Sequence, residues 1–307
     1  MIICCGEALI DMLPRQSADG GPAYLPKVGG SVFNTAIALG RLDVPVGFFS
    51  GLSTDFFGVD LKNALEASNV DLRYVHYTDL PTTLAFVKLT DGHASYIFYD
   101  ENSAGRMLSE DDLPDLQAEV SAMHFSGISL VPEPCGSTYE SLMRREHDRR
   151  VIMLDPNLRT PFIKDPERHR ARLKRMVAMA DIVKLSDEDL AWFGEDGSVE
   201  DIAKRWLSDG PSLVVVTSGA KGAVAYTAAG KVEAPAHKVE VVDTVGAGDT
   251  VNAGLLAAFH DAGVLTKEAI AKLSPSDIRT ALEFAARAAA ITVSREGANP
   301  PWRSELS

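Results

Sequence analysis

Short, unbroken runs of hydrophobic residues recur along most of the chain, and helical patterns separate them. Such runs lie at residues 2–5, 151–154, 182–185 and 213–217, and each of the last three precedes a segment with helical periodicity. Strands buried on both faces have this continuous apolar pattern, whereas half-exposed strands alternate. The pattern therefore predicts an α/β fold over residues 1–307, with a mostly parallel central sheet and helices on both faces.

Three segments have clear helical periodicity. Residues 31–41 and 57–68 predict two helices early in the chain, and residues 250–259 predict one near its end. Apolar residues three and four positions apart share one face of a helix. In the second helix we therefore expect Val59, Leu61, Ala64 and Leu65 to lie on the buried face.

One segment departs from this pattern and predicts an antiparallel hairpin. Residues 83–89 and 94–99 are rich in β-branched and aromatic residues and flank the turn signal Asp91-Gly92. An antiparallel pair fits poorly inside a parallel sheet, so we expect a small β-sheet lid, made of residues 12–28 and 83–104 and attached to the main body. The alternative is that the hairpin forms an edge of the main sheet.

Composition narrows the class of protein. A hydrophobic content of 46% is that of a folded chain, and 43 acidic against 30 basic residues give a formal net charge of −13. This balance argues against nucleic acid or an anionic membrane as a partner. No run reaches the ~18 apolar residues of a membrane span. Three cysteines cannot build a disulfide framework, and we expect a cytoplasmic enzyme.

The most informative motif is Asp-Thr-Val-Gly-Ala-Gly-Asp at residues 243–249, directly before the helical run 250–259. Gly246 and Gly248 leave backbone N–H groups free to face an anion at a helix N-terminus, where the helix dipole adds to the attraction. Asp249 could simply cap the helix. N–H donors beside a carboxylate are also what phosphoryl transfer to an alcohol requires, because the donors stabilise the transferring group and the carboxylate accepts the hydroxyl proton.

Two other phosphate-binding motifs fail on spacing. The chain has no Gly-x-x-x-x-Gly-Lys-Ser/Thr, so it is not a P-loop enzyme. Gly246, Gly248 and Gly254 do not match the dinucleotide fingerprint, because the third glycine follows the second by six positions instead of three. A Rossmann dehydrogenase remains an alternative that titration with a nicotinamide would test.

Two signatures together resemble the PfkB/ribokinase family of sugar kinases. The 243–249 motif is similar to the family's C-terminal signature, and Gly29-Gly30 followed by Asn34 and Ala36 is similar to its N-terminal one. The stretch 155–159, Asp-Pro-Asn-Leu-Arg, resembles fructokinases and 2-keto-3-deoxygluconate kinases. The resemblance spans essentially the whole chain. It implies a ribokinase-like fold and an ATP- and Mg²⁺-dependent kinase acting on fructose. The alternatives are 2-keto-3-deoxygluconate, ribose or a nucleoside as acceptor, and a non-catalytic sugar-binding sensor.

The resemblance also implies roles for particular residues. The catalytic group would comprise the base Asp249, the anion-hole backbone of Gly246, Ala247 and Gly248, and Arg159 as a phosphate or acceptor ligand. Sugar binding would involve Asp11, Gly29, Gly30, Asn34, Arg159 and a lid aromatic ring, which is Phe98, Tyr96 or Phe86. Nucleotide binding would involve Lys184, Ser186, Thr217, Gly219, Lys221, Gly222 and Gly248.

Metal ions and assembly follow from the same resemblance. The family's Asn-x-x-Glu motif, which organises Mg²⁺ through water, falls here on Ser186 and Asp189, so Glu188 is an alternative. The residues that match the monovalent-cation loop of relatives are Asp243, Val245, Thr292, Arg295 and Gly297, and they imply K⁺ as an activator. Dimers that form through the lid are common in the family, so we expect a homodimer.

Overall fold

A nine-stranded sheet forms the centre of the protein, whose structure is a computed structural model that describes residues 1–90 and 93–306. Its strand order is β15-β14-β13-β12-β11-β10-β1-β4-β6, parallel except for the pairs that β14 makes with β13 and β15. The strands are β1 (Ile2–Cys5), β4 (Val46–Phe49), β6 (Val70–Asp71), β10 (Ala122–Ser126), β11 (Val151–Asp155), β12 (Ile182–Ser186), β13 (Leu213–Thr217), β14 (Ala223–Thr227) and β15 (Gly230–Ala234).

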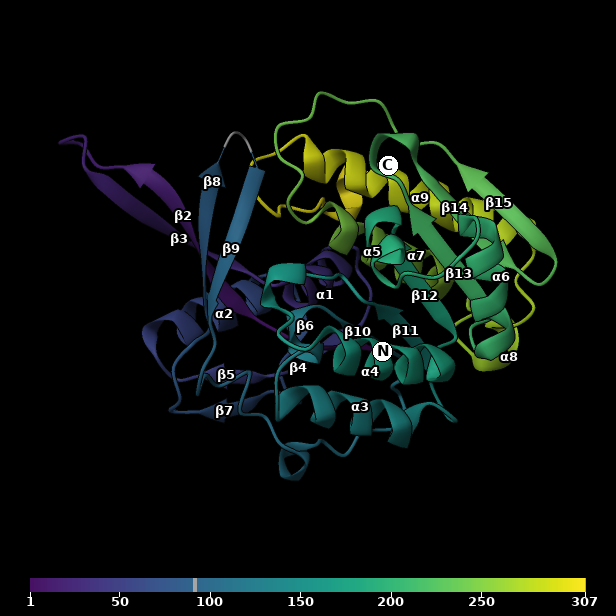
Figure 1. Ribbon diagram of the computed structural model, residues 1–307, viewed down its shortest axis with the longest axis horizontal. Coiled ribbons are helices and arrows are strands. Elements are labelled where there is room, and N and C mark those ends of the chain that lie inside the picture. The colour runs from purple at the N-terminus through teal and green to yellow at the C-terminus, as the bar shows by residue number, and fades with distance from the viewer. Residues whose placement is uncertain (91–92, 307) are drawn as a thin grey trace.

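Helices cover both faces of this sheet, as the sequence predicts (Figure 1). One face packs against α1 (Ser31–Arg41), α2 (Phe56–Ala67), α7 (Ala247–Asp261), α8 (Lys267–Ile270) and α9 (Pro275–Val293). The other packs against α3 (Cys135–Glu146), α4 (Pro166–Met179), α5 (Asp187–Trp192) and α6 (Val199–Asp209).

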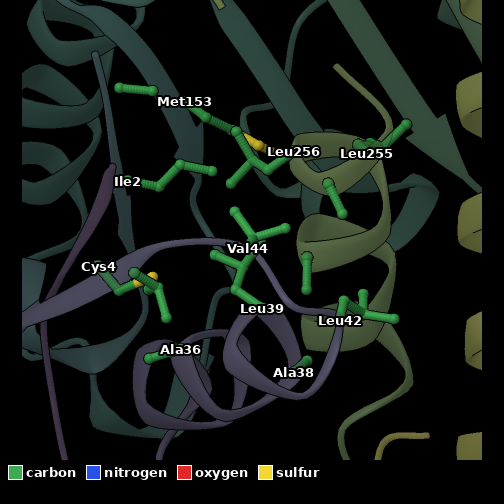
Figure 2. Close-up of a cluster of buried hydrophobic side chains, with 14 of the residues drawn as sticks. Ile2, Cys4, Ala36, Ala38, Leu39, Leu42, Val44, Met153, Leu255 and Leu256 are labelled. Atoms are coloured by element: carbon green, nitrogen blue, oxygen red, sulfur yellow. The ribbon is translucent and has the colours of Figure 1, made fainter. Parts of the chain in front are cut away.

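Strand β1 shows why its sequence is apolar throughout. Ile2 and Cys4 point into the first core, which is the one on the α1 and α7 side of the sheet, and Leu39 of α1 and Leu256 of α7 also lie there (Figure 2). Neighbouring residues of a strand point to opposite faces, and Ile3 therefore belongs to the second core. The strand has no polar face because neither face meets water.

A second sheet contains the predicted hairpin. Its four strands, in the order β3-β2-β8-β9, are β2 (Leu9–Gln16), β3 (Pro22–Gly29), β8 (Leu84–Thr90) and β9 (His93–Tyr99). Strands β8 and β9 pair antiparallel, and both belong to this second sheet and not to the main one, so the alternative of an edge hairpin of the main sheet is wrong. The turn signal Asp91-Gly92 lies outside the described residues. Figure 1 shows this sheet at one side of the main body, with the β2–β3 end projecting outward. A further pair joins β5 (Gly51–Ser53) and β7 (His76–Thr78).

The predicted helices agree with the structure to within a few residues, but one predicted face is partly wrong. Helix α1 has the predicted bounds, and α2 is displaced by one residue from the predicted range. Leu61 is buried in the core, whereas Val59 is 47% exposed because it lies on the solvent side of α2. In the part of the chain that the structure describes, no helix is long and apolar enough to cross a membrane.

Candidate active site

A cavity of about 910 Å³ opens at the carboxyl ends of the parallel strands, between the main sheet and the small sheet. This is the edge of an open α/β sheet at which ligands bind. Predicted residues from distant parts of the sequence line it together: Asp11, Gly30, Asn34, Phe98, Arg159, Lys184, Ser186, Thr217, Gly219, Gly222, Val245, Gly246, Ala247, Gly248 and Asp249. The cavity therefore gathers most of the candidate sugar and nucleotide residues in one place.

The N-terminus of α7 faces this cavity with unused hydrogen-bond donors. Gly246 precedes the helix in a left-handed conformation (φ 78°), and a Cβ there would lie 2.7 Å from Cβ of Ala298. Of the predicted anion-hole donors, Ala247 N–H donates to the carbonyl of Thr244 at 3.3 Å. Within the described residues, the N–H groups of Gly246, Gly248 and Asp249 have no acceptor. Free donors at a helix N-terminus attract an anion.

Asp249 stands on the first turn of α7 and is 7% exposed. Its Oδ2 accepts a hydrogen bond from Nδ2 of Asn34 at 2.8 Å, which joins α7 to α1. Burial raises the pKa of Asp249 to about 7, against the hydrogen bond from Asn34 and the positive charge of Lys184, which lower it. A carboxylate with that pKa can accept a proton near neutral pH.

A second carboxylate, that of Asp11 on β2, also lines the cavity. A Cβ on Gly29 would lie 2.3 Å from Oδ2 of Asp11, so glycine at this position leaves room for the carboxylate. Burial raises the pKa of Asp11 to about 6, and the charge of Arg159 opposes that rise. Asp11 and Asp249 are therefore two cavity-lining carboxylates whose pKa burial raises, and Asp249 is the one hydrogen-bonded to Asn34 of α1.

The lid aromatics divide between the two faces of the small sheet. Tyr96 and Phe98 line the cavity and stack on each other with ring centroids 5.9 Å apart. Phe86 lies on the other face, in contact with Tyr24 and Tyr99. Of the three rings considered for the sugar, Phe86 therefore does not reach the cavity.

Glu7 is a residue of this site that no sequence motif indicated. Its Oε1 accepts from N–H and Oγ of Ser31 at 3.0 and 2.8 Å, and its Oε2 accepts from N–H of Ser129 at 3.3 Å. The side chain lines the cavity at the N-terminus of α1, whose N-cap is Gly30. Its place directly after β1, at the carboxyl end of a parallel strand, was the available signal.

Arg159 lines the cavity from the loop after β11. Its Nη1 donates to Oδ1 of Asn157 at 2.6 Å and to the carbonyl of Leu158 at 3.1 Å. Asn157 adopts a left-handed conformation (φ 41°) at the turn that follows the strand. These contacts hold the guanidinium on the cavity wall.

At the other end of the cavity, the predicted nucleotide residues have different environments. Lys184 is buried, with Nζ 2.9 Å from Oδ2 of Asp155. The Ser186 hydroxyl caps α5 by accepting from N–H of Asp189 at 2.9 Å. Lys221 is exposed and does not line the cavity. An apolar wall at this end, which no sequence motif indicated, is formed by Val239, Val241, Ala285, Ala286, Ala289, Ala290 and Val293.

The predicted cation loop is held together by Asp243. Its Oδ1 accepts from N–H of Val245 at 3.0 Å and its Oδ2 from N–H of Gly297 at 2.9 Å, so two separate loops meet there. The Thr292 hydroxyl is buried and lies 2.9 Å from Oγ1 of Thr250. The guanidinium of Arg295 turns to Glu305 at the C-terminus. Any cation at this place would therefore bind to backbone carbonyls.

Comparison with known proteins agrees with this geometry. The family model described as pfkB family carbohydrate kinase matches residues 1–305. A fructokinase of Rhizobium leguminosarum bv. trifolii is 54% identical over 279 residues, which are 91% of this chain and 86% of that one. The crystal structure of a fructokinase with bound ATP from Xylella fastidiosa superposes with a TM-score of 0.92 at 29% identity, covering 99% of this chain and 96% of the other.

A third similar protein was solved with ligands. A fructokinase double mutant from Vibrio cholerae O395, in its fructose, ADP and potassium ion bound form, has a TM-score of 0.83 at 26% identity and covers 97% of this chain and 93% of its own. The fold and the site together define an ATP-dependent sugar kinase with a ribokinase-like fold. More particularly, the chain belongs to the PfkB family of carbohydrate kinases, which confirms the resemblance found in the sequence.

Proposed function

We propose that this protein is a fructokinase, which transfers the γ-phosphoryl group of ATP to a hydroxymethyl oxygen of fructose. The observation that carries the proposal is the position of Asp249, between the amide of Asn34 and the free N–H groups of α7. An acceptor hydroxyl beside this carboxylate would face an anion-binding helix terminus directly. The fructokinase that is 54% identical supports fructose as the acceptor.

In the proposed reaction Asp249 accepts the proton of the attacking hydroxyl. In a loose transition state the alcohol loses its proton late, so a carboxylate of moderate basicity suffices. The N–H groups of Gly246 and Gly248 stabilise the negative charge on the transferring phosphoryl group. Arg159 faces the same space and can hold a phosphoryl oxygen with its planar guanidinium.

The sugar would lie between α1 and the small sheet. Asp11 accepts hydrogen bonds from adjacent hydroxyls, and Asn34 offers both a donor and an acceptor. Phe98 and Tyr96 cover the apolar face of the ring. Glu7 and Asp11 place two carboxylates at this end, which favours a neutral ketose over an anionic acceptor such as 2-keto-3-deoxygluconate.

The nucleotide would occupy the other end of the cavity. The adenine ring fits the apolar wall of α9, and the phosphates run past Thr217 and Gly219 toward α7. Lys184 supplies a positive charge beside Gly248, since a Cβ on that glycine would lie 3.1 Å from Nζ. The protein's net negative charge thus coexists with local donors for an anion.

Three successive carboxylates line the cavity wall, those of Asp187, Glu188 and Asp189. Oδ1 of Asp189 accepts from N–H of Leu158 at 3.1 Å and Oγ of Ser186 accepts from N–H of Asp189, so Glu188, the alternative named above, and its neighbour Asp187 fit a Mg²⁺ ion carried by the nucleotide better. No group of three or more His, Cys, Asp or Glu side chains in the described part of the chain could hold a metal by itself. Mg²⁺ commonly binds through one or two carboxylates, waters and substrate phosphates. When bound, the ion neutralises charge on the β- and γ-phosphates.

We also propose that K⁺ binds to the carbonyls of the loops that Asp243 joins. The junction lies directly before α7, so an ion there would fix the position of the anion hole. The potassium-bound structure of the Vibrio cholerae relative supports this assignment. Equal rates in K⁺ and in a bulky organic cation would contradict it.

The small sheet is proposed to act as a lid, comprising residues 12–28 and 83–104, and as the surface through which two copies pair. Tyr24, Ile97 and Tyr99 on its outer face are 51%, 55% and 62% exposed. Apolar exposure of this size on one sheet face is typical of an interface. A molar mass of one chain in analytical ultracentrifugation would contradict the dimer.

The three cysteines are unpaired, which supports a cytoplasmic location.

A phosphorylation screen tests the proposed activity. ATP consumption would be measured with fructose, 2-keto-3-deoxygluconate, ribose and adenosine under the same conditions. We expect the highest kcat/KM with fructose. Preference for 2-keto-3-deoxygluconate or ribose would replace the acceptor while keeping the kinase, and sugar binding without ATP consumption would identify a sensor.

A further inference from the structure

Three buried polar side chains meet beneath the N-terminus of α7. Asp155 on β11 and Lys184 on the neighbouring strand β12 point to the face of the main sheet that α7 covers, and Asn252 points down from α7. Their residues are 1%, 4% and 0% exposed. Ionic groups are almost never fully buried unless each charge is compensated by partners.

The carboxylate of Asp155 is the centre of this group. Its Oδ2 accepts from Nζ of Lys184 at 2.9 Å and from Nδ2 of Asn252 at 2.8 Å, and its Oδ1 accepts from N–H of Asn157 at 3.2 Å. Donors therefore surround the carboxylate on both oxygens. The direction in which Lys184 points is fixed because the carboxylate itself is fixed.

Lys184 keeps donors available for a ligand. Within the described residues Asp155 is the partner of its Nζ, so the ammonium, which has three N–H groups, can still donate to a second acceptor. The side chain lines the cavity, and Nζ stands beside Gly248 of the anion hole. A buried ion pair contributes little to stability compared with apolar residues of the same volume. Its opening onto the cavity suggests another reason for its presence.

We propose that Asp155 and Asn252 are positioning residues that aim the ammonium of Lys184 at the γ-phosphoryl group of the bound nucleotide. The inference rests on the proposed phosphoryl transfer at α7. Asn252 follows Asp249 by three positions, so one face of α7 carries both the base and the amide that orients the carboxylate of Asp155. The Oδ1 atom of Asn252 is buried without a partner in the described structure, so the amide acts here through its N–H group.

A double-mutant cycle on kcat tests this arrangement. Asp155→Asn, Lys184→Met and the double variant would be assayed with ATP and fructose. We expect Lys184→Met to lower kcat about 100-fold and Asp155→Asn about 30-fold, with the KM for fructose changed by no more than about threefold. Because Asp155 acts through Lys184, the double variant should be no slower than Lys184→Met alone. Losses that multiply in the double variant would overturn the proposal.

Two further variants separate positioning from folding. Asn252→Leu keeps the size of the side chain and the ion pair but removes the orienting donor, and we expect kcat to fall about fivefold. Asp181→Asn is the matched control, because Asp181 also binds a lysine, Lys267 at 2.7 Å, away from the cavity. It should lower the unfolding temperature and leave kcat unchanged. An unchanged kcat in Asn252→Leu would remove Asn252 from the proposal.

Calorimetry tests Lys184 without any sugar. A non-hydrolysable ATP analogue and ADP would be titrated into the wild type, Lys184→Met and Asp155→Asn. We expect about tenfold weaker binding of the ATP analogue and no more than about threefold weaker binding of ADP. Equal weakening of both ligands would overturn the assignment to the γ-phosphoryl group. Inactivity with fructose would instead contradict the proposed acceptor and leave this comparison valid.

Discussion

Two helices that follow a glycine face the same cavity, and their N-termini differ in one respect. Helix α1 begins after Gly30 and α7 after Gly246, and neither has a side-chain cap on its N-cap residue. At α1 the carboxylate of Glu7 accepts the N–H of Ser31 at 3.0 Å. At α7, within the described residues, the N–H groups of Gly248 and Asp249 remain without an acceptor. At the N-terminus of α1 the chain itself supplies the acceptor, and we call this helix mouth closed. At the N-terminus of α7 the N–H groups stay available to a ligand, and we call this helix mouth open.

The difference indicates which substrate belongs at which end. A helix N-terminus carries a partial positive charge and attracts anions. At α1 a buried carboxylate already satisfies that charge, so a phosphate gains little there and would meet electrostatic repulsion. At α7 the charge is unsatisfied, and a transferring phosphoryl group can use it. The proposed orientation of sugar and nucleotide therefore follows from the position of Glu7.

Asp249 connects these two ends. It belongs to the first turn of α7, yet its hydrogen bond comes from Asn34 of α1. The proposed base consequently lies at the boundary between the closed and the open helix mouth. An acceptor hydroxyl bound to Asn34 and a phosphoryl group bound to α7 would meet at this carboxylate.

The largest expected effect comes from Asp249→Asn. This variant keeps the size of the side chain but removes the proton acceptor, so we expect kcat to fall about 1,000-fold with little change in the dissociation constant of fructose. Steady-state kinetics and fructose titration measure the two quantities. Turnover close to that of the wild type would contradict the assignment of Asp249 as the base. It would also contradict the different functions proposed for the N-termini of α1 and α7.

A smaller effect is expected from Gly248→Ala, which narrows the open mouth. The added Cβ would lie 3.1 Å from Nζ of Lys184 and would occupy space next to the phosphoryl group. We expect kcat to fall about 100-fold. Gly248 lies in the first turn of α7 and does not have a left-handed φ, so alanine adds no backbone strain and the unfolding temperature should not decrease. Loss of activity together with loss of stability would indicate a folding defect instead.

Much of the fold could be predicted because both faces of the main sheet are buried. Continuous apolar runs located β1, β11, β12 and β13, and periodicity located α1 with its observed bounds. The antiparallel strands β14 and β15, the last two at one end of the main sheet, were not predicted. Val59 was placed on the wrong side of α2, since periodicity alone does not show how wide the buried face of a helix is.

Within the site, motifs located the residues close in sequence and missed the long-range partners. Gly246, Gly248 and Asp249 share one helix mouth, so a local motif identifies them together. Glu7 meets Ser31 only through tertiary packing. Two lysines near strand ends looked alike in the sequence, but Lys184 points into the cavity and Lys221 is exposed. The direction of a side chain after a turn depends on packing that a local pattern does not contain.

Removing the carboxylate of Glu7 should convert the N-terminus of α1 into an anion-binding site. In Glu7→Ala the N–H groups of α1 lose their carboxylate, and we expect inorganic phosphate to become a competitive inhibitor against fructose. The KM for fructose should rise about tenfold. Glu7→Gln is the matched control, because its amide oxygen can still accept the N–H of Ser31. Phosphate inhibition in Glu7→Gln as strong as in Glu7→Ala, or in neither variant, would contradict the role assigned to Glu7.

The smallest expected effect is a shift in the pH profile of kcat/KM, which reports the ionisation of the free enzyme. Asp249 must be ionised to accept a proton, and burial raises its pKa to about 7, so kcat/KM should increase as the pH rises through that value and level off above it. The hydrogen bond from Asn34 lowers this pKa, so Asn34→Ala should move the rising limb to higher pH. Asn34 is on α1, whereas Asp249 is on α7. If the rise in activity occurs at the same pH in Asn34→Ala as in the wild type, Asn34 of α1 does not influence the ionisation of Asp249 on α7.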